Sequence, residues 1–99
     1  MSLAPDILFF VERSFPVGDR AEVVRVLDGA VLHDGTGADP RCQRAALVAS
    51  GGSLSDLRAL VSMLAVDFRD VVVAGEYERH GTEWLQVRDL RQPFKLDND

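Results

Sequence analysis

The sequence predicts an all-α fold, a compact bundle of four to five short helices in a single domain spanning residues 1–99. Three observations support this prediction. Apolar residues recur at helical spacing, capping residues precede several of these segments, and glycine or proline residues follow them. A chain of 99 residues suffices for one domain with one core.

The N-terminal third contains two predicted helices. The first begins at Pro5, a residue suited to the first helical turn, and includes the apolar run 7–11. The segment Phe-Pro-Val-Gly at 15–18 breaks it, because proline and glycine disfavour continued helix. A second, amphipathic helix is predicted over residues 20–32, with Asp19 as its N-cap.

Residues 39–52 carry clear start and stop signals for a third helix. Asp39 offers a side-chain acceptor at the N-cap, and Pro40 fits the first helical position. The helix is expected to run to Ser50, with a face of small side chains that would let another helix approach closely. Gly51 and Gly52 end it by permitting a left-handed turn.

The fourth predicted helix contains the clearest apolar stripe. Ser53 is its N-cap. The stripe consists of Leu54, Leu57, Leu60, Val61 and Leu64. Asp67 stands where the stripe would continue, so we expect a bend there and a new helical segment from Phe68 to about Tyr77.

The region after Asp67 leaves two alternatives open. The β-branched run 71–73 favours strand, and a β-hairpin over about 71–88 would turn at His80-Gly81, giving an α+β fold. The polar tail at 91–99 is expected to fray.

Part of the chain forms a pattern that is similar to a known family. The pattern consists of Arg41, Gln43, Ala45 and Leu47, then Gly52, Leu54, Leu57 and Val61, then Asp67-Phe68-Arg69-Asp70-Val71 and Glu76-Tyr77. It resembles a family of small, uncharacterised bacterial proteins of about this length. The resemblance covers residues 39–78 and implies a helical build, but it brings no activity, cofactor or substrate.

The strongest candidate for a functional cluster lies in the same region. It comprises Asp67, Arg69, Asp70, Glu76 and Tyr77. If these side chains converged in a concave pocket, they would suit a small enzyme or a ligand-binding protein. The simpler interpretation is structural, with the aspartates as helix caps and the arginine in an ion pair.

Trp84 is a candidate for an interface, because exposed aromatic residues mark docking surfaces. The simpler interpretation is that Trp84 packs in the hydrophobic core.

Composition excludes several functional classes. The net charge is −5 without a basic cluster, so no nucleic-acid partner is expected. The longest apolar run, 7–11, is too short to cross a membrane. Cys42 is the single cysteine, which excludes a disulfide within the chain and fits a cytoplasmic location. No metal-binding or cofactor motif is present, so no cofactor is expected.

The sequence therefore predicts a cytosolic helical module for protein–protein interaction or regulation, without catalytic activity. Self-association through the C-terminal aromatic segment is one form of this hypothesis. The alternative is a small enzyme or ligand-binding protein that uses the Asp67–Tyr77 cluster.

Overall fold

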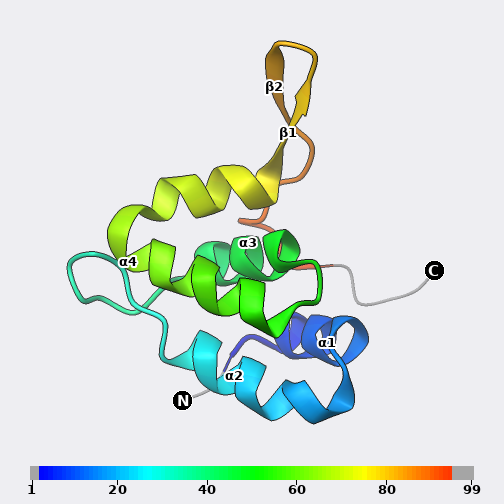
Figure 1. The fold of residues 1–99 in the computed structure, drawn as a ribbon, viewed down its shortest axis with the longest axis vertical. Helices are drawn as coiled ribbons and strands as arrows, with labels where there is room; N and C mark the ends of the chain where they lie inside the picture. The colour runs from blue at the N-terminus through cyan, green and yellow to red at the C-terminus, as the bar shows by residue number, and fades with distance from the viewer. Residues whose placement is uncertain (1–2, 95–99) are drawn as a thin grey trace.

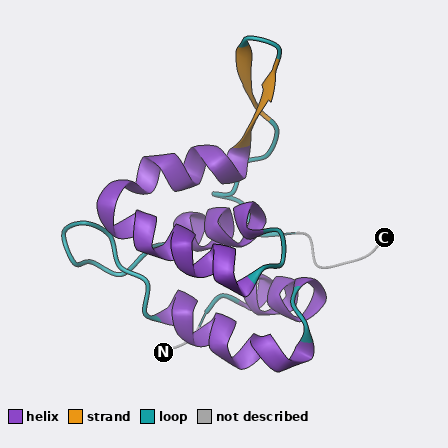
Figure 2. Ribbon diagram, viewed as in Figure 1, coloured by secondary structure: helices purple, strands orange, loops and turns teal. Residues whose placement is uncertain are grey.

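The computed structural model describes residues 3–94, within which four α-helices are followed by one β-hairpin (Figures 1 and 2). The elements are α1 (Pro5–Ser14), the 3-10 helix η1 (Val17–Asp19), α2 (Arg20–Asp28), α3 (Pro40–Ser50), α4 (Leu54–Glu76), β1 (Tyr77–His80) and β2 (Glu83–Gln86). The predicted helical build is confirmed for the body. The all-α class does not hold for residues 77–86, where the hairpin of the α+β alternative forms.

The first two helices follow the prediction except at the two ends of α2. Asp19 precedes the helix as predicted, but its side chain makes no capping hydrogen bond, because η1 leads directly into α2 and holds the Asp19 backbone in a helical conformation. This helix stops at Asp28, not at the predicted residue 32. Gly29 closes the last turn, and Ala30 then accepts a backbone hydrogen bond from Ala38 across the following loop. Because the backbone pairs across the loop, it does not continue the helix.

The caps predicted for α3 and α4 are confirmed. Asp39 Oδ1 accepts the backbone N–H of Cys42 at 2.9 Å, and Ser53 Oγ accepts that of Asp56 at 3.2 Å. Between them, Gly51 ends α3 in the left-handed region, with φ of 61°. A tight turn therefore joins these two helices.

The bend predicted at Asp67 is also confirmed. Asp67 has non-helical backbone angles inside α4, with φ of −154° and ψ of 94°. Its side chain accepts the backbone N–H of Arg69 at 3.1 Å and so caps the second half of the helix. The two halves of α4 consequently run in different directions (Figure 1).

The second half of α4 lies very close to α3. A Cβ atom on Gly75 would lie only 2.6 Å from Cα of Ala45. The face of small side chains predicted for α3 therefore lets α4 approach closely. This contact fixes the place where α4 ends and the hairpin leaves the body.

The core draws on all four helices, and the leucine stripe of α4 contributes the fully buried Leu57 and Leu64. The buried apolar residues are Leu3, Ile7, Val11, Phe15, Val23, Leu27, Ala30, Cys42, Ala45, Ala46, Leu47, Leu57, Leu64, Val71, Val72 and Leu90. Burial of Val71 and Val72 in α4 explains why the β-branched run is helical: packing against the core outweighs the local preference for strand.

The hairpin extends α4 directly and projects beyond the helices (Figure 1). Its strands pair antiparallel, with Tyr77 opposite Gln86 and Arg79 opposite Trp84. It is shorter than the predicted 71–88.

The chain then returns to the helical body. Leu90 is buried, and the ring of Phe94 stacks on that of Phe10 with centroids 4.3 Å apart. Of the tail predicted to fray, residues 91–94 thus run back to the body, and residues 95–99 lie outside the described range.

Candidate functional site

Glu76, the last residue of α4, is fully buried and anchors the root of the hairpin. Its carboxylate accepts hydrogen bonds from Arg41 Nε and Nη2 at 2.9 and 2.8 Å. Gln86 Nε2 donates to it at 3.2 Å, and the backbone N–H of Leu90 at 3.0 Å. The hydrogen bonds from Arg41 lower the pKa of Glu76 against the opposing effect of burial. The carboxylate is therefore ionised at neutral pH and engaged within the chain.

A second buried ion pair fastens the segment after the hairpin. Arg44 Nε and Nη2 donate to Asp6 at 2.8 and 3.1 Å, and Arg44 Nη1 donates to the carbonyl of Leu90 at 3.0 Å. The backbone N–H of Phe94 also donates to Asp6 at 2.9 Å. Burial alone would raise the pKa of Asp6, but its hydrogen bonds from Arg44 and Phe94 bring the pKa below its ordinary value. Leu90 is thus held by α3, and Phe94 is held by α1.

A concavity of about 340 Å³, here called the α3–α4 groove, lies between the start of α3 and the second half of α4. It is lined by Asp39, Arg41, Cys42, Phe68, Arg69, Val72, Val73 and Tyr77. Its walls combine apolar side chains with guanidinium groups. The close packing of α4 on α3 and the bend at Asp67 position these two helices beside each other.

Tyr77 connects this groove to one face of the hairpin. Side chains of an antiparallel pair alternate between faces, and directly opposed residues share a face. Tyr77, Arg79, Trp84 and Gln86 therefore lie on one side, here called the hairpin face. Trp84 is 57% exposed on it. The groove and the hairpin face thus adjoin at Tyr77.

The structure brings only part of the predicted Asp67–Tyr77 cluster together. Arg69 and Tyr77 line the α3–α4 groove. Asp70 lies in a separate depression of about 230 Å³ on the other side of α4. Asp67 caps the helix, and Glu76 is buried in its ion pair. The five side chains do not converge on one pocket.

Cys42 lines the groove but is 2% exposed. Burial, with the Asp39 side chain beside it, raises the pKa of the Cys42 thiol to about 12. The thiol is protonated at neutral pH, so it lacks the thiolate that a nucleophile requires. Within residues 3–94, no group of three or more histidine, cysteine, aspartate or glutamate side chains is arranged to hold a metal ion.

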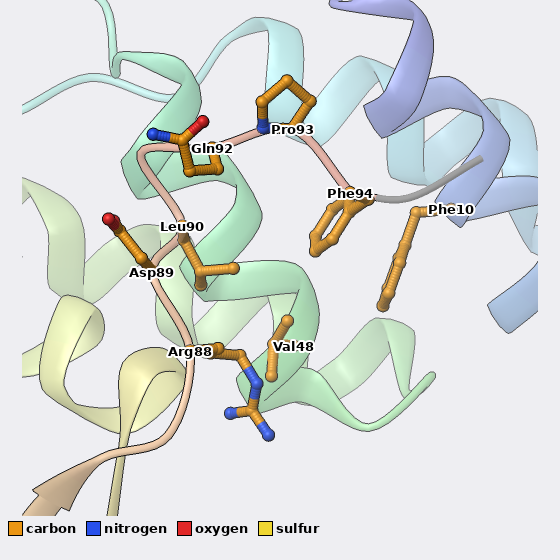
Figure 3. Close-up of a pocket in the computed structure, with 8 residues that line it drawn as sticks. All are labelled: Phe10, Val48, Arg88, Asp89, Leu90, Gln92, Pro93 and Phe94. Atoms are coloured by element: carbon orange, nitrogen blue, oxygen red, sulfur yellow. The ribbon is translucent and has the colours of Figure 1, made fainter. Parts of the chain in front are cut away.

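A larger concavity of about 440 Å³ lies between the returning C-terminal segment, α1 and α3 (Figure 3). Phe10 and Phe94 face each other at one end, and Val48 and Arg88 lie at the other. The stacked rings of Phe10 and Phe94 belong to its lining.

The sequence signals missed two residues of this region. In the sequence, Arg41 stands out only within the family pattern, and Asp6 is an acidic residue in a first helical turn, where such residues are common without a distant partner. Their partners, Glu76 and Arg44, lie 35 and 38 positions away, so no local pattern pairs them.

No family model matches the chain, and neither curated proteins nor solved structures show a match. The resemblance to a family of small bacterial proteins therefore remains a prediction. Among the described helices, none is both long and apolar enough to cross a membrane.

Proposed function

We propose that this protein is a cytosolic protein–protein interaction module that contacts its partner through the hairpin Tyr77–Gln86. The observation that carries the proposal is the 57% exposure of Trp84 on a hairpin that projects from the helical body (Figure 1). Burial of a large aromatic side chain is favourable, and tryptophan is enriched among residues that dominate binding energy. An exposed tryptophan in this position supports a role in contact with another protein.

The anchoring of the hairpin supports the same function. The buried carboxylate of Glu76 and the partly exposed guanidinium of Arg41 hold its root in an ion pair, so its position relative to the helices is set before binding. Preorganisation reduces the entropy lost on association. Within residues 3–94, each strand of the hairpin also pairs with one neighbour only, which leaves an edge where an extended segment of a partner can pair.

The alternative function, a small enzyme or ligand-binding protein that uses the predicted cluster, receives less support. Its acidic members are a helix cap, a buried ion-pair partner and a residue on another side of α4.

A cytosolic location is supported by Cys42, a buried thiol in a chain with no other cysteine. The net charge of −5 argues against a nucleic-acid partner. Membership of the bacterial family is compatible with this role.

Site-specific photo-crosslinking in the source cells tests the proposal. A photoreactive phenylalanine analogue replaces Trp84 in one variant and Val17, which is 77% exposed in η1, in the control. We expect a discrete crosslinked protein from position 84 and none from position 17. Absence of an adduct at position 84, or the same adducts at both positions, would contradict the proposal.

A further inference from the structure

We propose that the α3–α4 groove binds a short segment of a separate partner protein in which a bulky apolar side chain stands near an aspartate or glutamate. The inference rests on the proposed interaction function and specifies the chemistry of the ligand. Three features carry it: the apolar walls of the groove, the guanidinium donors that remain available around it, and its continuity with the hairpin face.

The size and walls of the groove suit an apolar side chain. Phe68 is partly buried beside the core, Val72 is buried, and Val73 is 39% exposed. The volume of about 340 Å³ lies at the lower end of the range for ligand sites, about 300–1,000 Å³. This is space for one or two large side chains of a peptide. An apolar anchor would cover surface that is otherwise in water.

Guanidinium donors remain available among the polar groups around the groove. Asp39 and Asp67 each cap a helix by accepting a backbone hydrogen bond through Oδ1, and Asp67 Oδ1 also accepts Arg69 Nε. Glu76 accepts four hydrogen bonds in the interior. The side chain of Arg69 is 79% exposed, and its contact with Asp67 is made through Nε. Within residues 3–94, no hydrogen bond or ion pair engages its two terminal amino groups.

Arg79 has a similar arrangement on the adjoining hairpin face. Its Nε donates to the carbonyl of Gly81, and within the described range no carboxylate pairs with it. Arginine binds a carboxylate with two parallel hydrogen bonds when its amino groups are available. Arg69 lines the groove together with Tyr77, and Arg79 shares the hairpin face with Tyr77, so both offer such donors on a chain whose net charge is negative. An acidic side chain of the ligand is the complementary group.

The continuity of the two surfaces favours a peptide over a small molecule. Tyr77 borders the groove, and Trp84 lies further out on the same hairpin face. A small molecule that filled the groove would leave Trp84 exposed. A peptide with its apolar anchor in the groove would extend along the hairpin and cover it.

Selection of random twelve-residue peptides displayed on phage, with the full chain immobilised, tests this inference. The most enriched peptides are synthesised with a fluorescent label, and their affinities are measured for the unaltered chain, Arg69→Glu and Arg25→Glu. Arg25 is a matched control, because it is 76% exposed and pairs with a nearby carboxylate, Glu22, on α2. We expect enriched peptides with a large apolar residue close to an acid. Arg69→Glu should weaken them about tenfold or more, and Arg25→Glu less than about twofold.

A charge reversal sharpens the test. Peptides in which lysine replaces the acid should bind Arg69→Glu more tightly than they bind the unaltered chain. Failure to enrich peptides, enrichment without acids, or equal effects of the two substitutions would overturn the inference.

The crosslinking result at position 84 separates this inference from the proposed function. If the adduct forms but Arg69→Glu does not reduce it, the groove is not the ligand site and the interaction role stands. An adduct formed between two copies of this chain would overturn the inference that the ligand belongs to a separate partner protein. An adduct that is the same at positions 84 and 17 contradicts the interaction role itself, whatever the peptides do.

Discussion

At the residue scale, Glu76 connects the fold to the candidate site. It ends α4, it is fully buried, and its carboxylate binds Arg41, the side chain of Gln86 and the backbone of Leu90. A buried charge is tolerated only when it is paired and fully hydrogen-bonded. This one residue therefore holds the helix end, the hairpin and the returning segment together.

Replacing Glu76 with Gln should destabilise the protein by about 2–4 kcal/mol, because Arg41 then loses its partner and the buried hydrogen bonds weaken. Urea unfolding followed by circular dichroism measures the change. Glu78→Gln is the control, since the Glu78 side chain is 54% exposed, and it should cost less than about 0.5 kcal/mol. Equal losses would show that Glu76 is not the anchor.

The stability should also depend on pH in acid. The pKa of Glu76 in the folded chain lies below its ordinary value of 4.5, and that of Asp6 below 3.8. The unfolded chain therefore takes up protons first as the pH falls. The stabilisation is present above about pH 4.5 and is lost as the pH falls through the folded pKa values. The difference in urea midpoint between the unaltered chain and Glu76→Gln should consequently narrow from pH 7 to pH 3. A constant or widening difference would contradict this.

Cys42 should react slowly with a thiol reagent at neutral pH, because it is buried and its pKa is raised to about 12. A colorimetric disulfide reagent, added with and without urea, measures the rate. Rapid labelling in urea and slow labelling in buffer is the expected result. Fast labelling of the folded chain would support a reactive thiol in the groove.

At the scale of elements, the packing of α4 on α3 sets the position of the hairpin. Gly75 lies against Ala45 with no room for a side chain. The short turn at Gly51 and the bend at Asp67 bring the second half of α4 to this contact. The α3–α4 groove and the root of the hairpin both depend on it.

Gly75→Ala should destabilise the protein by about 1–3 kcal/mol, since the added methyl group would overlap the α3 backbone. Gly18→Ala is the control, because a Cβ atom there meets nothing within 4 Å. That variant should be neutral or slightly more stable. Thermal unfolding of both variants checks the pair. A neutral Gly75→Ala would mean that the two helices are less closely packed.

The parts of the fold that sequence predicted are those that depend on local chemistry. The caps at Asp39 and Ser53 and the bend at Asp67 each involve a side chain and a backbone group within a few residues. The predicted end of α2 at residue 32 was wrong, because the backbone hydrogen bond from Ala38 to Ala30 forms in place of a further helical turn.

The candidate site was harder to predict, because it depends on contacts between distant segments. The Arg41–Glu76 and Asp6–Arg44 pairs are 35 and 38 positions apart and join different helices. Arg69 and Glu76 are seven positions apart, which is compatible with one helical face, but this spacing does not show that the Glu76 side chain is buried in the interior.

At the scale of the whole molecule, the helical body supports one surface that combines an apolar groove with a projecting hairpin. Arg69 lies at the groove and Trp84 on the hairpin, so a ligand that uses both must bridge the two parts. We propose that the groove and the hairpin act as one binding face.

The most direct test is the yield of the crosslinked product from position 84, measured in three backgrounds: no further change, Arg69→Glu, and the matched Arg25→Glu. If the groove and hairpin form one face, Arg69→Glu lowers the yield by about tenfold while Arg25→Glu leaves it unchanged. Equal yields in all three backgrounds, or equal losses in the two arginine variants, would contradict the claim.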